Sequence, residues 1–78
     1  MKEFQIELHS VQDTLDFVAL ATSRPFQVLV SSAHHQVNGK SFMEMFCLNL
    51  RLPQKVTVDC TEEEFRQFLL DTHRFLAK

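Results

Sequence analysis

The chain has 78 residues and a mass of 9.1 kDa, enough for one small domain, which excludes a two-lobed enzyme with a cleft between its halves. Its 8 Lys and Arg and 10 Asp and Glu give a net charge of −2, so there is no basic field to attract nucleic acid or an anionic membrane. With 45% hydrophobic residues, one Gly and two Pro, the composition predicts a single domain over residues 1–78.

The two cysteines, Cys47 and Cys60, are too few for a disulfide framework and lack the spacing of a redox or zinc motif. Both are therefore interpreted as small core residues. No window approaches the roughly 18 apolar residues in a row of a membrane span, and no signal peptide is recognised. We expect a cytoplasmic protein with no metal site and no cofactor.

Three segments alternate apolar and polar residues, the pattern of half-buried strands, and a weaker strand is predicted between the second and third of them. The four predicted strands run near residues 3 to 8, 26 to 32, 36 to 40 and 54 to 60. In the first, for example, Phe4, Ile6 and Leu8 alternate with polar residues. We expect these four strands to form one sheet.

The connection between the second and third strands has two readings. One places it at Ala33-His34-His35, which leaves room for a strand before the next helix. The other places a tight hairpin turn at Asn38-Gly39, the strongest short hairpin signal in the chain. We favour the first, because the second leaves no space for a third strand.

Three helices are predicted near residues 10 to 23, 41 to 48 and 61 to 76. Each opens on a hydroxyl residue that is followed three positions later by an acid, the signature of a capped helix start. The pairs are Ser10 and Asp13, Ser41 and Glu44, and Thr61 and Glu64. The order βαββαβα predicts an α+β open-faced β-sandwich, in which helices cover one face of a four-stranded antiparallel sheet.

Helical spacing also predicts which residues of the two longer helices lie on one apolar stripe. In the first helix the predicted stripe consists of Val11, Leu15, Val18 and Thr22. In the last helix it consists of Phe65, Phe68, Leu69, Thr72 and Leu76.

The segment from Lys40 to Leu50, within this element order, resembles HPr, the histidine-containing phosphocarrier of the bacterial sugar phosphotransferase system. The second helix of that family opens with a Lys-Ser pair followed by apolar residues, as Lys40-Ser41-Phe42-Met43 does here. The last strand of the family is similar to Lys55-Val56-Thr57-Val58. The ungapped match runs from Ser10 to about Cys60, and it implies an HPr-like domain over residues 1–78.

In HPr a histidine at the start of the first helix carries the phosphate, in a motif of the type Gly-hydrophobic-His-x-Arg-Pro-Ala. Free helix amides and the arginine stabilise the phosphoryl oxygens there. In this chain the histidine position falls on Ser10, the arginine position on Gln12 and the proline position on Asp13. The resemblance therefore implies a divergent member that lacks the phosphoacceptor histidine. His9, one residue earlier, is the candidate acceptor if the alignment is shifted.

Ser41 matches a serine that a dedicated kinase phosphorylates in many Gram-positive HPr proteins, so it is a candidate for regulatory phosphorylation. A helix cap paired with Glu44 also explains this serine without a kinase. Phe42, Met43 and Phe46 fall where the family presents an apolar docking patch. A short helix that is apolar all round cannot bury every side chain on one side, so we expect these three to be partly exposed.

The sequence contains no catalytic triad, Gly-rich phosphate loop or metal-ligand spacing, so we expect no enzyme activity. It is interpreted as a non-catalytic HPr-like protein-interaction or regulatory module, a monomer or weak homodimer. The expected partners are proteins, either phosphotransferase-system components or a transcriptional regulator, rather than nucleic acid or membrane. Two alternatives stay open: an active phosphocarrier that uses His9, and an interaction domain unrelated to sugar transport.

Overall fold

The computed structural model describes residues 2–32, 35–48 and 52–76. Its elements follow the order β1 (Lys2–Ile6), α1 (Val11–Thr22), β2 (Val28–Ser32), β3 (His35–Asn38), α2 (Phe42–Met45), β4 (Gln54–Val58), α3 (Glu62–Asp71) and a short 3-10 helix, η1 (His73–Phe75). The predicted α+β fold with the order βαββαβα is confirmed. None of the described helices is long and apolar enough to cross a membrane.

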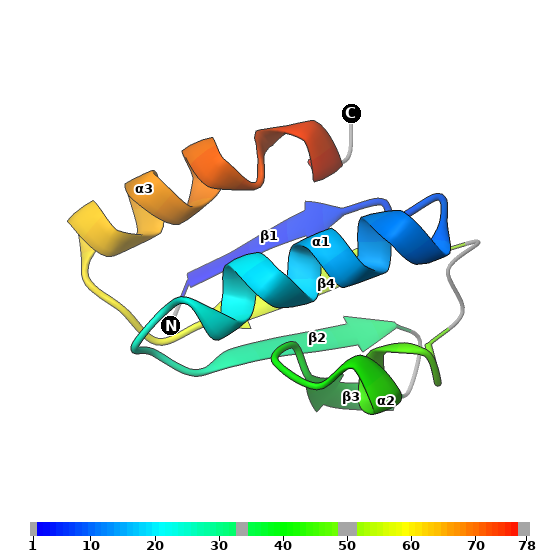
Figure 1. Ribbon diagram of the computed structural model, residues 1–78. Coiled ribbons are helices and arrows are strands. Elements are labelled where there is room, and N and C mark those ends of the chain that lie inside the picture. The colour runs from blue at the N-terminus through cyan, green and yellow to red at the C-terminus, as the bar shows by residue number, and fades with distance from the viewer. Residues whose placement is uncertain (1, 33–34, 49–51, 77–78) are drawn as a thin grey trace.

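The four strands form one antiparallel sheet in the order β1-β4-β2-β3. β4 therefore lies between β1 and β2, and Val56 of β4 pairs with Phe4 on one side and with Val30 on the other. Helices α1 and α3 run over one face of the sheet, and α2 lies next to β3 at one edge (Figure 1). Because the helices share a face, the other face of the sheet stays open.

The connection between β2 and β3 agrees with the first of the two readings. β2 ends at Ser32, β3 begins at His35, and these two residues are opposite each other in the sheet. Ala33 and His34 lie outside the described residues. His35, which was predicted to belong to the connection, is part of the strand.

The hairpin reading of Asn38-Gly39 is wrong, although a turn does occur there. The turn leads from β3 into α2, and the Ser41 amide donates to the Asn38 carbonyl at 3.0 Å. Gly39 does not extend the strand, so β3 ends at Asn38 rather than at Lys40. The Gly39 amide instead donates to the Val28 carbonyl at 2.8 Å, which brings this turn close to β2.

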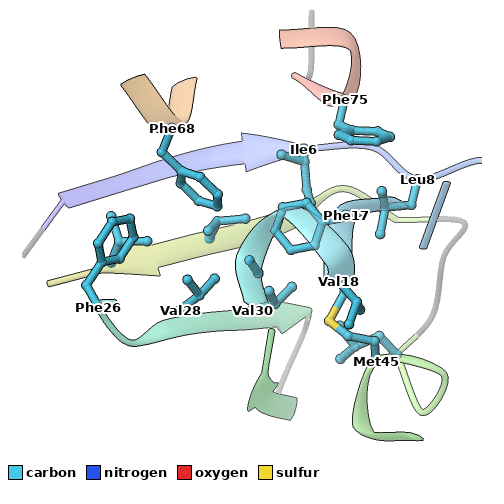
Figure 2. Close-up of a cluster of buried hydrophobic side chains, with 14 residues drawn as sticks. Ile6, Leu8, Phe17, Val18, Phe26, Val28, Val30, Met45, Phe68 and Phe75 are labelled. Carbon is cyan, nitrogen blue, oxygen red and sulfur yellow. The ribbon is translucent and has the colours of Figure 1, made fainter. Parts of the chain in front are cut away.

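Phe68 of α3 lies at the centre of an aromatic cluster between the helices and the sheet (Figure 2). Its ring centroid is 5.6 Å from that of Phe26, 5.9 Å from that of Phe4 and 6.3 Å from that of Phe17. The contacts with Phe4 and Phe26 are edge-on, the geometry that aromatic quadrupoles favour. These rings join β1, α1, α3 and the segment before β2 into one core.

Leu15, Val18 and Thr22 of the stripe predicted for α1 share one side of the helix, but Val18 is the one residue of the stripe that is buried. The buried residues of α1 are Thr14, Phe17, Val18 and Ala21. Val11 is exposed, because the large Phe17 ring packs against the core and turns the helix so that Val11 faces solvent. The side of α1 that carries Leu15 faces α2 instead of the sheet.

The last helix is interrupted where a continuous helix to residue 76 was predicted. α3 ends at Asp71, and the buried Thr72 hydroxyl donates to the Phe68 carbonyl at 2.8 Å. The chain then forms η1, whose Phe75 is buried while its carbonyl accepts from the Glu7 amide at 2.7 Å. This bond holds the C-terminal segment against the end of β1, which stops at Ile6 rather than at Leu8.

α2 is also shorter than predicted, ending at Met45 rather than at Leu48. After Met45 the chain makes tighter bonds, with the Cys47 amide donating to the Glu44 carbonyl and the Leu48 amide to the Met45 carbonyl. β2 begins at Val28 and β4 ends at Val58, each two residues inside the predicted range. Residues 49–51, the end of the segment that resembles HPr, lie outside the described residues.

Candidate functional site

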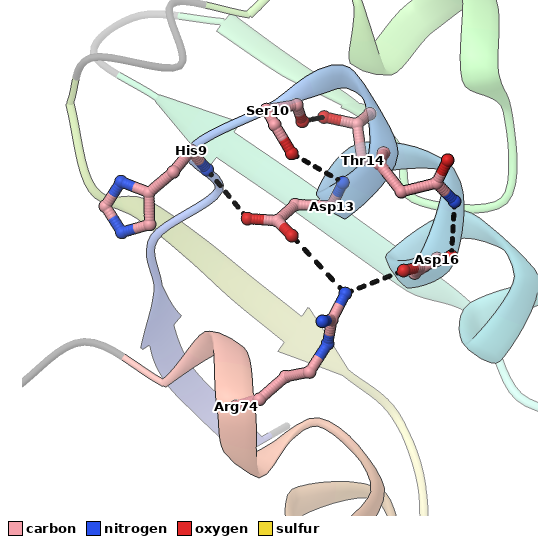
Figure 3. Close-up of polar contacts among 7 residues, drawn as sticks. His9, Ser10, Asp13, Thr14, Asp16 and Arg74 are labelled. Atoms are coloured by element: carbon pink, nitrogen blue, oxygen red, sulfur yellow. Dashed lines mark hydrogen bonds and ion pairs between the residues drawn. The ribbon is translucent and has the colours of Figure 1, made fainter.

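The N-terminus of α1 is capped as the sequence predicts. Ser10 is extended, with φ −153° and ψ 168°, and its Oγ accepts from the Asp13 amide at 3.1 Å. The Thr14 hydroxyl donates to the Ser10 carbonyl at 3.2 Å (Figure 3). Ser10 is therefore confirmed as the N-cap of the helix.

The Asp13 carboxylate lies at the same helix end and is held from two sides (Figure 3). Its Oδ2 accepts from the His9 amide at 3.1 Å, and its Oδ1 lies 3.3 Å from the Arg74 guanidinium. Arg74 also contacts Asp16, at 2.7 Å. The negative charge of Asp13 thus lies at the N-terminus of α1, where the helix dipole favours an anion.

The two other residues predicted near the N-terminus of α1, His9 and Gln12, are exposed beside it. The His9 imidazole is 75% exposed and points away from Asp13 and Arg74, with Glu7 Oε2 at 3.6 Å as a neighbour (Figure 3). Gln12 is exposed, and the Nε2 of its side-chain amide donates to Asp16 Oδ1 at 2.9 Å. Neither side chain is directed at the amides of the first helical turn.

Arg74 is the site residue that sequence reasoning missed. It is separated from Asp13 and Asp16 by 61 and 58 residues, so no local spacing indicates the contact. Packing positions it: its guanidinium lies 4.3 Å from the Phe75 ring centroid, and Phe75 packs edge-on against Phe17 of α1 at 6.1 Å. The cation therefore reaches α1 from the C-terminal segment.

Ser41 starts α2 in the same way that Ser10 starts α1. Its Oγ accepts from the Glu44 amide at 3.4 Å, which confirms the predicted cap. The Glu44 carboxylate turns back and accepts from the Asn38 amide at 3.3 Å. Ser41 is half-buried, and a carboxylate lies one turn away from it.

Phe42, Met43 and Phe46, which we call the α2 patch, are 43%, 82% and 48% exposed, so their predicted exposure is confirmed. The rings of Phe42 and Phe46 stack with centroids 6.3 Å apart and planes inclined by 15°. Met45 is the one residue of α2 that is buried. α2 thus anchors itself through Met45 and presents the patch outward.

A shallow apolar groove runs between α1 and α2, with a volume of about 640 Å³. Leu15, Val18, Ala19 and Thr22 form its α1 side, while Phe42 and Lys40 form the other. The Lys40 ammonium donates to the Arg24 carbonyl at 2.7 Å, just beyond the end of α1. Since Phe42 belongs to both features, the groove and the α2 patch form one surface, which we call the docking face.

Replacing both Phe42 and Phe46 by serine should leave the thermal midpoint nearly unchanged, because about half of each side chain is already in water. We expect a loss of no more than about 0.5 kcal/mol per substitution, which lowers the midpoint by only a few degrees. Circular dichroism during heating measures the thermal midpoint of the variant and of the wild type. A loss of several kcal/mol would mean that these rings belong to the core and that the docking face is not a free surface.

The prediction that both cysteines are core residues is wrong for Cys47, whereas Cys60 packs against the edge of the core. Cys47, just after α2, is exposed, and its thiol donates to the Met43 carbonyl at 3.5 Å. Cys60 is half-buried; its burial, with a smaller contribution from the charge of Glu64, raises the pKa of its thiol. Within the described ranges, no three His, Cys, Asp or Glu side chains gather where they could hold a metal ion.

A second pocket of about 320 Å³ lies between the α1–β2 connection and the start of α3. Its lining includes Arg24, Phe26, Glu63 and Gln67. The Arg24 guanidinium pairs with Asp71 and lies 5.3 Å from the Phe68 ring centroid. Arg24 therefore joins the end of α1 to α3 through this ion pair.

The solved structure of HPr-C-His from Thermoanaerobacter tengcongensis is similar to this chain, with a TM-score of 0.74 and 28% sequence identity. The similarity covers 92% of this chain and 90% of that one. No protein-family model matches the chain, and a search of curated proteins found no match. The chain has an HPr-like fold and is related to the phosphocarrier of the sugar phosphotransferase system.

Proposed function

We propose that this chain is a non-catalytic, HPr-like protein-binding or regulatory module of the bacterial cytoplasm. One observation carries the proposal: the Asp13 carboxylate lies at the N-terminus of α1, between the His9 amide and the Arg74 guanidinium. In the resembling family this helix end receives the phosphoryl group. The alignment that the resemblance implies places Ser10 at the acceptor position.

Electrostatics support this reading of α1. A phosphoryl group brought to the helix end would meet the charges of both Asp13 and Asp16, and the Arg74 guanidinium beside them already contacts both. Repulsion between like charges raises the free energy of such a complex. A serine hydroxyl, in addition, cannot form the labile phosphoramidate by which a histidine passes a phosphoryl group on.

A phosphocarrier that uses His9 is the second candidate, and the exposure of its imidazole is the observation in its favour. A free imidazole nitrogen in solvent can accept a phosphoryl group. The neighbouring Glu7 carboxylate, 3.6 Å away, opposes it through charge repulsion. His9 also lacks the position over the helix amides that stabilises phosphoryl oxygens.

Ser41 has a structural role that accounts for it, since its hydroxyl caps α2. A phosphate there would lie close to the Glu44 carboxylate and be repelled by it. We therefore propose that the docking face, rather than phosphorylation of Ser41, carries the function. Its partners would be proteins of the phosphotransferase system or a transcriptional regulator, and an interaction domain unrelated to sugar transport would use the same surface.

Incubation with phosphoenolpyruvate and the general phosphotransferase enzyme should leave the protein without acid-labile phosphate. The reason is that the resemblance aligns Ser10 with the acceptor position, and the Asp13 carboxylate lies at the same helix end. The acid-labile phosphate is measured as radioactivity that the protein gains from labelled phosphoenolpyruvate and loses on acid treatment. An authentic HPr is the positive control.

Stoichiometric acid-labile labelling would contradict the proposal. If that labelling disappears in His9→Ala and persists in His35→Ala, the chain is a phosphocarrier that uses His9. His35 is a matched control, because it is likewise exposed and lies on β3, away from α1.

A further inference from the structure

We propose that the groove between α1 and α2 binds the anion of a free fatty acid, whose acyl chain lies along α1 and whose carboxylate pairs with the Lys40 ammonium. The inference goes beyond the proposed function, because its ligand is a small amphipathic molecule and not a protein. It combines the shape of the groove with the position of Lys40, which is the one charged residue among the described residues that line it.

The α1 side of the groove provides room for the acyl chain. Leu15, Val18, Ala19 and Thr22 line it at helical spacing, and the distance from Leu15 to Thr22 along the helix is about 10 Å. Phe42, which is 43% exposed, forms the opposite wall. The volume of about 640 Å³ lies in the usual range of small-molecule pockets. A chain of medium length can therefore lie along α1 with Phe42 at its side.

The polar atoms of the lining side chains lie at one end of the groove. Thr22 is the last residue of α1, and the Lys40 ammonium donates to the carbonyl of Arg24, two residues further on, at 2.7 Å. Leu15 lies about two turns away from Thr22, toward the start of α1. Since the remaining lining side chains are apolar, the groove has an apolar length and one cationic end.

The charge of Lys40 lacks a carboxylate partner in the part of the chain that the structure describes. Lys2, Arg24, Lys55 and Arg74 each form an ion pair with a carboxylate, whereas the Lys40 ammonium contacts a neutral carbonyl. An ammonium group has three donors, and the Arg24 carbonyl takes one of them. The carboxylate of a ligand would accept from the other donors and supply the missing counter-charge.

The anion of a fatty acid matches both parts of this groove. Its acyl chain has no hydrogen-bonding group that would stay unpaired against the apolar lining, and its burial removes apolar area from water. Its carboxylate forms a charge-assisted hydrogen bond with the ammonium, which is stronger than the bond that a neutral hydroxyl would form. An alkylammonium would place a like charge beside Lys40 and be repelled. Lys40 therefore selects the sign of the head group.

The test uses octanoate, octanol and octylammonium, which have alkyl chains of similar length and differ in the head group. Each is titrated as a monomer into the isotope-labelled full chain, and amide shifts give the dissociation constant. We expect octanoate to bind with a dissociation constant on the order of 1 mM, as suits a ligand of its size. Octanol should bind about 3- to 5-fold more weakly, and octylammonium more weakly still. The shifts should lie on α1, on α2 and at Lys40.

Two lysine variants with the same change of charge separate the groove from overall electrostatics. Lys40→Gln should weaken octanoate by about 3- to 5-fold and octanol by less than about 2-fold. Lys55→Gln is the matched control, because Lys55 is 50% exposed and lies on β4, outside the groove. It should change the binding of either ligand by less than about 2-fold. Ala19→Phe fills the groove from an exposed position of α1 and should abolish the binding of both ligands.

Equal binding of octanoate and octanol, equal effects of the two lysine variants, or absence of binding would overturn the inference. Vesicles of phosphatidylglycerol test the other source of acyl chains and negative charge. If the protein sediments with these vesicles, loses that binding in Lys40→Gln and shows no shifts with octanoate, the ligand is a membrane lipid and the inference is overturned. The phosphoenolpyruvate labelling experiment tests the proposed function independently of these results.

Discussion

Replacing Phe68 by alanine should lower the free energy of unfolding by about 3–5 kcal/mol. Phe68 is fully buried and contacts the rings of Phe4, Phe17 and Phe26, which come from three other parts of the chain. The loss combines the transfer of a large apolar side chain with the cavity that the neighbours cannot fill. Since domains are stable by about 5–15 kcal/mol in total, urea denaturation should show a much lower midpoint.

Leu70→Ala is the matched control, because Leu70 lies in the same helix and is 64% exposed. We expect its effect to stay within about 0.5 kcal/mol. Equal effects of the two substitutions would mean that Phe68 is not the residue that joins α3 to the rest of the core.

Gly39→Ala should cost about 1–3 kcal/mol, through overpacking rather than through a cavity. A Cβ at position 39 would lie 2.8 Å from Val28 Cγ1 and 3.1 Å from Val30 Cγ2, and both valines are fully buried. It would also lie 3.3 Å from the Val28 carbonyl oxygen, which accepts the Gly39 amide. The turn would have to move away from β2, and α2 with its patch would move with it.

Gln36→Ala in β3 provides the control for an exposed position near this turn, and it should change stability by less than about 0.5 kcal/mol. Thermal or urea denaturation compares the two variants, and amide shifts of α2 report its displacement. Wild-type stability and unchanged α2 shifts in Gly39→Ala would show that the two valines can rotate away without cost.

The sequence by itself determined the elements and their ends to within a few residues, because these depend on local interactions. Alternation of period two identified β1, β2 and β4, and β3 was placed in the interval between the predicted connection and the next helix start. The caps at Ser10, Ser41 and Thr61 were all predicted, and the Thr61 cap forms a full capping box with Glu64. Each of these features joins residues that are at most a few positions apart.

The exposure of the α2 patch was also predictable, because four large apolar residues among five consecutive positions, 42–46, cannot all face the same way on a short helix. The identity of the buried residue was not. Met45 alone is buried because the position of α2 against α1 and β3 decides which side of the helix is covered.

Tertiary structure alone decided the buried side of α1, the break in the last helix and the contacts of the candidate site. Val11 and Leu15 have the spacing of a buried stripe, but Phe17 has the larger ring and takes the core position. The side chain of Thr72 could point to solvent or to its own helix, and burial against the core directs it to the Phe68 carbonyl. Arg74 reaches Asp13 and Asp16 only because β1 and the C-terminal segment lie side by side, and a contact across about 60 residues leaves no pattern in the local sequence.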